Sequence, residues 1–225
     1  MNKYTVFNEY DQKNIERILT LTGGEEKHFD KGEVILSSYG GHEEAGIMRK
    51  GLAYLLCVND LGSENILEYY EAGNTFGDIL SPHTNVNLYY ITAKTKCSVF
   101  MIHYRNIWDR LDLSEPSQRL FLQRMMCLPA KKKLMHIDIL SQRSIRSKLV
   151  TFFSYLREEQ TDQPSGNAPS INENTASGPV TLRCPMPLSD LADYLCTDRS
   201  AMMRELKKMN TDNIIRSHGQ IITLL

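Results

Sequence analysis

Two arginines and a serine near the end of the chain have the spacing of side chains that read the edges of DNA bases. Arg199, Ser200 and Arg204 fall in the first turns of an amphipathic run within LADYLCTDRSAMMRELKKM, which spans 191–209. On a helix these three positions share one face, and arginine is well suited to donate two parallel hydrogen bonds to guanine. The spacing predicts contacts with bases in a major groove. Two solvated helices packed at the edge of an unrelated core would show a similar pattern.

A helix-turn-helix is the element that would have to position these side chains. Its first helix needs a small apolar face, and the sequence offers one with four members: Leu188, Leu191, Ala192 and Leu195. Cys196 and Thr197 would form the turn, and Asp198 or Thr197 would cap the second helix by accepting hydrogen bonds from its free amides. On the second helix the pattern predicts three inward-facing residues: Met203, Leu206 and Met209.

The elements around this pair predict a winged helix-turn-helix. The run SIRSKLVTFFSYLREEQ has the apolar spacing of an amphipathic helix. A polar segment over 161–179, rich in Ser, Asn, Gly and Pro, follows it and is expected to form a loop. VTLRC and QIITLL then have the composition of short strands on either side of the helical pair. Helix, helix and strand pair in this order are typical of the winged form.

The residues from about 29 to 103 predict a different kind of domain. Short runs rich in Val, Ile, Tyr and Thr follow one another there: KGEVIL, GLAYLLCV, ENILEYY, NLYYITAKT and CSVFMI. Glycine, Asn and Asp turns separate them, as in Asn59-Asp60-Leu61-Gly62. This pattern indicates an antiparallel barrel or sandwich, preceded by one or two short helices in YDQKNIERILTLTG.

A long helix is expected between the two domains, from Ser114 to about Leu140. Ser114 would cap it and Pro116 is tolerated in its first turn, whereas Pro129 should kink or interrupt it. The apolar stripe of this helix is broad, so it needs a partner. That partner is either another helix of the same chain or a second copy across a symmetric seam.

Composition and charge limit the class of protein. The chain has 225 residues and 41% hydrophobic content, enough for one large or two modest domains. Its formal net charge is −1, but residues 1–129 carry 13 Lys and Arg against 17 Asp and Glu, and residues 130–225 carry 13 against 10. The second part is therefore compatible with a nucleic-acid partner.

The location expected for the protein is the cytoplasm. No apolar run approaches the ~20 residues of a membrane-spanning helix, and the first residues lack the apolar segment of a signal peptide. The five cysteines are scattered and never in a C-x-x-C spacing. We expect them to be reduced thiols.

The chain resembles the Crp/Fnr family of bacterial transcription factors over nearly its whole length. The resemblance lies in LADYLCTDRSAMMREL, which is most similar to regulators from Firmicutes, and in NIIRSHGQIITLL, which is similar to the wing of the family. KGEVIL, the glycine of RKGLAYLL, EAGNTFGDI and AKTKCSVFMI resemble the strands and turns of its cyclic-nucleotide-binding-like barrel. The resemblance implies a sensor barrel, a long dimerisation helix, a hinge and a winged helix-turn-helix.

Position by position, the resemblance implies that Arg199, Ser200 and Arg204 read a palindromic half-site. Many members have glutamate where this chain has Ser200, so the contact of an acid with cytosine is absent and a different target sequence is expected. Three residues would lie near backbone phosphates: Thr197, Asp198 and His218. Pro187 stands where the family often has a serine or threonine cap.

The resemblance also implies an effector site in the barrel. Members that bind cyclic nucleotides use a Gly-Glu pair for the ribose and an Arg-Ser pair for the cyclic phosphate, whereas this chain has Gly77-Asp78 and Asn87-Leu88. Without the arginine a buried phosphate would lack a charge partner, so cyclic AMP is not expected. We expect another small molecule, with Lys133 and Leu134 of the long helix facing it; its identity stays open.

Two cofactors known in the family are also not expected. An iron-sulfur cluster needs an N-terminal group of cysteines, and this chain has none before Cys57. Haem needs an axial ligand, and the candidates are dispersed without paired spacing: His28, His42, His83, His103, His136 and Cys97. The sequence therefore predicts neither a haem nor a metal site.

The sequence thus predicts an α+β protein in three parts. These are an antiparallel β-barrel of jelly-roll type over 1–113, a long dimerisation helix with a hinge over 114–143, and a winged helix-turn-helix over 144–225. We expect a homodimer without catalytic residues that binds an inverted-repeat site in double-stranded DNA under the control of a small effector, with RNA polymerase as a candidate further partner.

Two alternatives stay open. One is a cupin-like barrel that acts as a small-molecule enzyme or as a ligand-binding module and carries a helical assembly tail. The enzyme needs several histidines on neighbouring strands, and the strands hold no H-x-H pair. A regulatory subunit that has lost DNA binding is disfavoured because both arginines are present.

Overall fold

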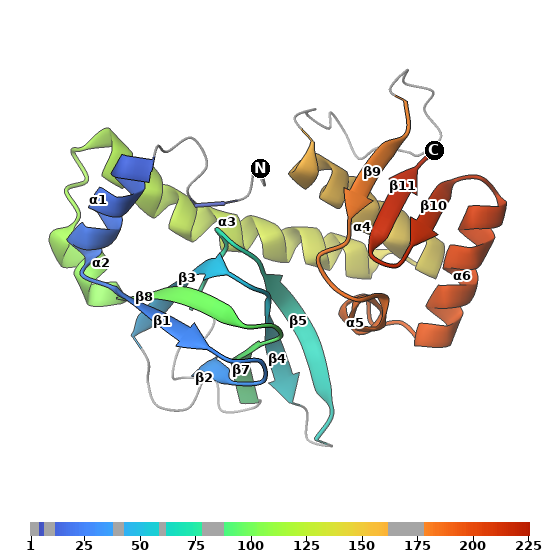
Figure 1. The fold of residues 1–225 in the computed structure, drawn as a ribbon, viewed down its shortest axis with the longest axis horizontal. Coiled ribbons are helices and arrows are strands. Elements are labelled where there is room, and N and C mark those ends of the chain that lie inside the picture. Colours follow the sequence, from blue (N-terminus) through green and yellow to red (C-terminus); the bar gives the residue numbers. More distant parts are fainter. Residues whose placement is uncertain (1–4, 7–11, 38–42, 59–61, 78–87, 162–177) are drawn as a thin grey trace. The chain divides into compact units, whose positions relative to one another are not determined.

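The computed structural model describes residues 5–6, 12–37, 43–58, 62–77, 88–161 and 178–225. It contains two compact units, of which one is Tyr4–Lys132 and the other contains Lys133–Leu225 (Figure 1). Parts of three sequence predictions lie outside the described residues: the turn at 59–61, the effector-site residues Asp78 and Asn87, and the polar loop over 162–177.

The described part of the first unit contains eight strands. They are β1 (Glu25–Phe29), β2 (Val34–Ser37), β3 (Glu44–Lys50), β4 (Ala53–Val58), β5 (Glu64–Tyr70), β6 (Thr75–Phe76), β7 (Leu88–Ala93) and β8 (Cys97–His103). They form two four-stranded sheets, in the orders β1-β8-β3-β6 and β2-β7-β4-β5, and every strand pair is antiparallel. The predicted antiparallel barrel is therefore confirmed.

Alternating side chains of both sheets form the core of the barrel. Successive residues of a strand point to opposite faces. Met48 of β3 and Val99 of β8 accordingly pack inward with Leu55 of β4 and Ile91 of β7. Ile47, next to Met48, and Ile102, next to the inward-facing Met101, point the other way, toward a second apolar cluster.

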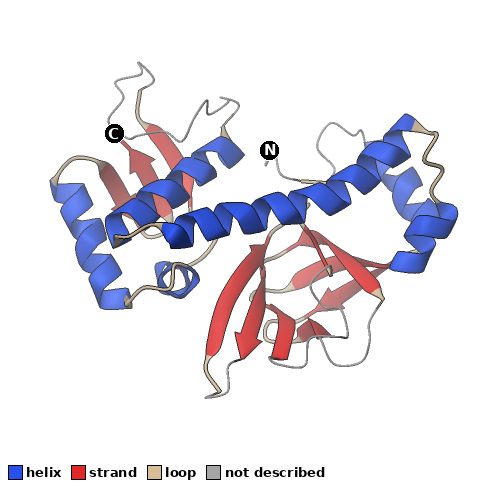
Figure 2. Ribbon diagram, turned by 180° about the vertical axis from the view of Figure 1, so that it is seen from behind, coloured by secondary structure: helices blue, strands red, loops and turns tan. Residues whose placement is uncertain are grey.

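Three helices supply that second cluster on the outer face of the β1-β8-β3-β6 sheet. They are α1 (Gln12–Thr22), α2 (Tyr104–Arg110) and α3 (Pro116–Ser141). Ile18 of α1, Ile107 of α2 and Phe121 of α3 are buried there. Figure 2 shows these helices and the two sheets from behind.

A glycine turn joins the two sheets at the start of β4. Gly51 has a φ of 94°, and a Cβ at this position would lie 2.5 Å from the carbonyl oxygen of Lys96. Only glycine fits both the left-handed backbone and the close approach. This glycine belongs to the RKGLAYLL motif on which the family resemblance rests.

Helix α3 differs from the sequence prediction at two points. It begins at Pro116, so Ser114 is not its cap; the Ser114 hydroxyl and amide instead bond the Asp112 carboxylate at 2.7 and 2.9 Å. It also runs through Pro129 to Ser141 without interruption. Proline removes one helical hydrogen bond, and buried residues on both sides, such as Phe121 and Ile139, hold the helix together.

The second unit contains the end of α3 followed by three helices and a three-stranded sheet. These are α4 (Ile145–Gln160), β9 (Val180–Arg183), α5 (Leu188–Tyr194), α6 (Arg199–Thr211), β10 (Ile215–His218) and β11 (Ile221–Leu224). The sheet order is β10-β11-β9, all antiparallel. This is the predicted winged helix-turn-helix order.

Helix α4 provides the base on which the other elements of this unit pack. Ser144 caps it by accepting a hydrogen bond from the Ser147 amide at 3.0 Å. Leu149, Phe152 and Phe153 of α4 are buried. At its far end the Gln160 side chain donates to the Arg183 carbonyl at 2.7 Å and accepts from the Arg183 amide at 2.9 Å, which ties α4 to β9.

Candidate nucleic-acid interface

Helix α5 is held by apolar contacts and followed by a tight turn. Of the four residues of the predicted packing face, Leu191, Ala192 and Leu195 are fully buried, whereas Leu188 is half-buried. The chain reverses at Cys196, whose φ of 49° is left-handed, and the Thr197 amide donates to the Ala192 carbonyl at 2.9 Å. The helix begins directly after Pro187, which provides no side-chain cap.

Asp198 caps the start of α6, as the sequence predicted. Its carboxylate accepts hydrogen bonds from the Ala201 amide at 2.8 Å and from the Ser200 hydroxyl at 2.6 Å. The Ser200 hydroxyl, and after it the Ala201 amide, lower the pKa of Asp198 below its ordinary value. A charged cap therefore fixes the first turn of α6.

The buried face of α6 is not the one predicted. Met202, Leu206 and Met209 are buried, whereas Met203 is 42% exposed. At about 100° per residue, positions 202, 206 and 209 fall within one narrow arc, while 203, 206 and 209 drift steadily around the helix. The prediction that Met203 faces inward was wrong by one residue.

The exposed face of α6 carries the three predicted base-reading residues. Arg199, Ser200 and Arg204 are all exposed, and the Arg204 Nε lies 3.4 Å from the Ser200 carbonyl oxygen. Lys207 is exposed on the same side, one turn after Met203. Lys207 was not among the predicted site residues, although it lies on the row of every fourth residue that begins at Arg199.

The sheet next to α6 exposes a second set of cationic side chains. Two of the residues predicted to contact phosphates are Thr197, which precedes α6, and His218, which belongs to β10. Thr197 is half-buried and His218 is exposed. In the strand register His218 lies opposite Ile221 of β11, which lies opposite Arg183 of β9. Arg183 and Arg216 are also exposed, so the outward face of this sheet is basic. Side chains alternate between the two faces of a strand, so the run IIRSHG could have indicated that Arg216 and His218 share the outward face.

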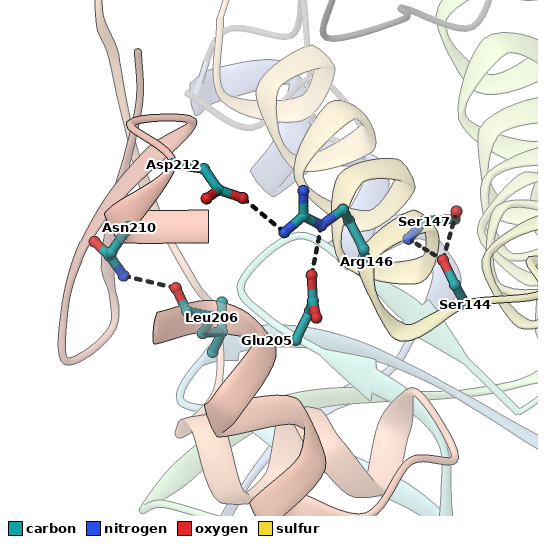
Figure 3. A network of polar contacts seen from close by, with 7 residues as sticks. All are labelled: Ser144, Arg146, Ser147, Glu205, Leu206, Asn210 and Asp212. Carbon is teal, nitrogen blue, oxygen red and sulfur yellow. Dashed lines mark hydrogen bonds and ion pairs between the residues drawn. The ribbon is translucent and has the colours of Figure 1, made fainter. Parts of the chain in front are cut away.

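An arginine on α4 holds α6 in place. Figure 3 shows Glu205 of α6 and Asp212, the residue directly after this helix, pointing toward Arg146. The Arg146 Nε lies 2.5 Å from Glu205 Oε1, and its Nη2 lies 2.9 Å from Asp212 Oδ2. The two carboxylates, Glu205 first, raise the pKa of Arg146. Because the guanidinium holds two carboxylates two turns apart, α6 is fixed in rotation about its axis.

The end of α6 is tied to the sheet as well. The Asn210 side chain donates to the Leu206 carbonyl at 2.9 Å and to the Ser217 hydroxyl at 2.7 Å, and it accepts from the Ser217 amide at 2.9 Å. The exposed faces of α6 and of β10 therefore belong to one rigid surface.

Several solved structures resemble the chain over nearly its whole length. A CooA mutant from Carboxydothermus hydrogenoformans matches with a TM-score of 0.70 at 18% identity, covering 100% of this chain and 91% of that one. A cyclic nucleotide-binding domain containing protein from Listeria monocytogenes gives 0.71 at 13%, covering 94% and 97%. TTHA1359, a CRP/FNR family transcriptional regulator from Thermus thermophilus, gives 0.54 at 20%, covering 89% and 93%. The chain has the CRP/FNR fold.

The sequence comparisons give no such match. No protein-family model matches the chain, and no curated protein matches it. The CRP/FNR fold is therefore established by the structure, at sequence identities too low to transfer a ligand or a target.

The structure explains why one predicted effector-site residue of the CRP/FNR barrel, Gly77, is a glycine. Gly77 follows β6 with a φ of 120°, and a Cβ there would lie 2.6 Å from the Glu44 carbonyl oxygen. Leu88 begins β7 in the same unit. Lys133 and Leu134 belong to the other unit, where Leu134 is 66% exposed. The effector pocket stays a prediction.

The CRP/FNR barrel also has a hollow away from the predicted effector-site residues, on the outward face of the β2-β7-β4-β5 sheet. It has a volume of about 710 Å³ and its lining includes Leu56, Glu64 and Tyr90. Burial and the Glu64 carboxylate raise the pKa of Tyr90 to about 12, so the phenol stays protonated and donates to Glu64. None of the predicted effector residues lines this hollow.

Neither a metal-binding cluster nor a membrane-spanning helix occurs among the described residues. Within those ranges, no three or more His, Cys, Asp and Glu side chains are grouped so that they could hold a metal ion. In the same ranges, none of the helices combines the length and the apolar content needed to cross a bilayer.

Proposed function

We propose that the chain is a DNA-binding transcriptional regulator that carries out no chemical step. The observation that supports this most is the exposed face of α6, where Arg199, Ser200 and Arg204 lie together on a capped helix clamped to α4. A helix of this kind enters the major groove with its N-terminal side chains toward the bases. Thr197, Asp198 and His218 then lie where backbone phosphates would pass.

The charge of the surface supports the same proposal. The exposed cations of α6 and of the sheet are Arg183, Arg199, Arg204, Lys207, Lys208 and Arg216. Phosphate contacts by such side chains release counterions, so affinity falls steeply as salt rises. Proteins of the same fold include one named as a transcriptional regulator.

We further propose that α3 forms a homodimer. Five exposed residues follow one another in steps of three and four along this helix: Cys127, Ala130, Leu134, Ile137 and Ser141. This is the spacing of a two-stranded coiled coil, in which such a seam faces the same seam of its partner. Leu134 and Ile137 are 66% and 62% exposed, so pairing would remove two large apolar side chains from water.

A homodimer of this kind predicts an inverted-repeat operator. Two copies of α6 related by a twofold axis would contact half-sites about one helical turn apart. A small effector bound in the barrel unit would shift the dimer between a state in which the two copies of α6 match the spacing of the half-sites and a state in which they do not. Cyclic AMP is not the expected effector.

Selection of bound fragments from random duplex DNA tests the first proposal. The selected sites should share an inverted repeat, and Arg199→Ala and Arg204→Ala should each lower affinity by about tenfold or more. Arg105→Ala, which removes an exposed arginine of α2 in the other unit, should leave affinity unchanged. Equal binding by all three variants would contradict the proposal.

Light scattering tests the dimer. Ile137→Glu places a charge in the seam of each copy and should shift the protein from dimer to monomer. Lys131→Glu, on an exposed position of α3 outside the seam, should remain dimeric. A wild-type protein that is monomeric at all concentrations would exclude this part of the proposal.

A further inference from the structure

We propose that Met203 contacts the C5-methyl group of a thymine in each half-site and so determines part of the target sequence. This inference rests on the proposed DNA binding and deepens it. It starts from the finding that Met202, and not Met203, fills the core position of α6.

The phase of α6 places Met203 on its exposed side, about 100° around the helix from the buried Met202. Arg199, Met203 and Lys207 follow one another at intervals of four residues and are all exposed. Ser200 and Arg204 form the adjacent row. Met203 is therefore an apolar side chain flanked by cationic and polar ones, on the surface that would face the bases.

The clamp on α6 keeps this phase fixed. Glu205 lies about 200° around the helix from Met203, and it is held by Arg146 on the side that faces α4 (Figure 3). A rotation that turned Met203 inward would break this ion pair and expose Met202. The methionine is thus held outward by contacts on the opposite side of the helix.

The Ser200 side chain has no proton left to donate to a base. Its hydroxyl donates to the Asp198 carboxylate at 2.6 Å, so its proton is already used within the cap. The oxygen of Ser200 retains only the capacity to accept. Met203, which lies between Arg199 and Arg204 in the sequence, is then the long side chain that can make an apolar contact with a base.

Thymine is the base that suits this side chain. In the major groove its C5-methyl group is the apolar feature among donors and acceptors. Methionine is unbranched and adapts its three rotatable bonds to the surface that it meets. Contact would remove both apolar groups from water, whereas a cytosine or a purine at this place would bury the methionine against polar edges.

Replacement of single thymines by deoxyuridine tests the inference with the wild-type protein. The substitution removes one methyl group and leaves every hydrogen-bonding edge of the base pair intact. At one thymine of each half-site in the selected operator, the loss should be about fourfold per half-site, as expected for burial of one methyl-sized group. If no thymine of the half-site shows a loss, the inference is wrong.

Variants at this position complete the test. Met203→Ala should bind the thymine and deoxyuridine operators equally, and Met203→Leu should keep most of the difference. Thr211→Ala, at an exposed position of the same helix, should keep the full difference of about fourfold. A difference that persists in Met203→Ala would overturn the inference. If no operator is selected at all, the proposed function fails instead, so the two failures are distinguishable.

Discussion

The imidazole ring of His136 lies parallel to the phenol ring of Tyr194, with 3.9 Å between ring centroids and 7° between the planes. His136 Nε2 also lies 2.8 Å from the Tyr194 carbonyl oxygen, and since this oxygen only accepts, the nitrogen must donate. Both residues are buried. One side chain thereby joins the end of α3 to α5 of the helix-turn-helix.

Removal of this side chain should destabilise the second unit. His136→Ala loses the stack and leaves a buried carbonyl with one bond fewer, so we expect the free energy of unfolding to fall by about 2–3 kcal/mol. His136→Phe keeps the stacking area and should recover part of the loss. Urea denaturation measures both. His28→Ala, at an exposed position of β1, is the control, and a loss as large in that variant would contradict the interpretation.

Lys132 should be a major contributor to the stability of the first unit. Its Nζ lies 3.6 Å from Glu68 Oε1 and 3.1 Å from Asn74 Oδ1, donates to the Tyr69 carbonyl, and lies 3.6 Å from the centroid of the Tyr69 ring. Lys132→Ala leaves the buried Glu68 carboxylate without this cation and should cost about 3 kcal/mol.

Two further variants make the Lys132 prediction specific. Because the loss comes from a buried carboxylate that no longer has this cation beside it, adding Glu68→Gln to Lys132→Ala should restore part of the stability. Lys13→Ala, an exposed lysine of α1, should change the free energy of unfolding by less than about 0.5 kcal/mol. If the double variant is less stable than the single one, the charge argument does not hold.

The cap of α6 should respond to acid. The Ser200 hydroxyl and the Ala201 amide hold the pKa of Asp198 below its ordinary value, so the stability that it contributes is present above that value and is lost as pH falls through the lowered pKa. Ser200→Ala should raise the pKa of Asp198 toward 3.8. NMR titration of the Asp198 carboxyl carbon measures this, and the Thr211→Ala variant should leave it unchanged.

Arg146 should position α6 through its shape as well as its charge. Arg146→Lys keeps one positive charge but cannot reach two carboxylates at once, so affinity for the selected operator should fall severalfold while the dimer persists. The Arg146 side chain is 35% exposed, so the loss of unfolding free energy should be small. Arg143→Lys, an exposed neighbour, provides the comparison. Equal loss of affinity in both variants would exclude a positioning role.

Most of the fold was predictable from local pattern. Strand alternation and turn residues predicted the barrel, and the caps and apolar spacing of 188–211 predicted the helix pair, because short-range preferences and packing agree there. Asp198 is a clear case, since a cap needs only its own next three residues.

The errors arose where packing decides between near-equal local choices. Met202 and Met203 are chemically identical, and only the arc shared with Leu206 and Met209 selects the buried one. Lys132 could not be assigned from sequence, because its partners Glu68 and Tyr69 lie more than sixty residues away and are brought near only by the fold.

The boundary between the two units falls inside α3, after Lys132, and not in the short connection to α4. Beyond it, His136 is fastened to Tyr194, Asp138 accepts from the Tyr155 hydroxyl at 2.6 Å, and Lys148 of α4 donates to the Leu195 carbonyl at 2.9 Å. Residues 133–141 are therefore fastened to the unit that contains α5 and α6. A rotation of this end of α3 would therefore turn α6 with it, without any bending at Ser144.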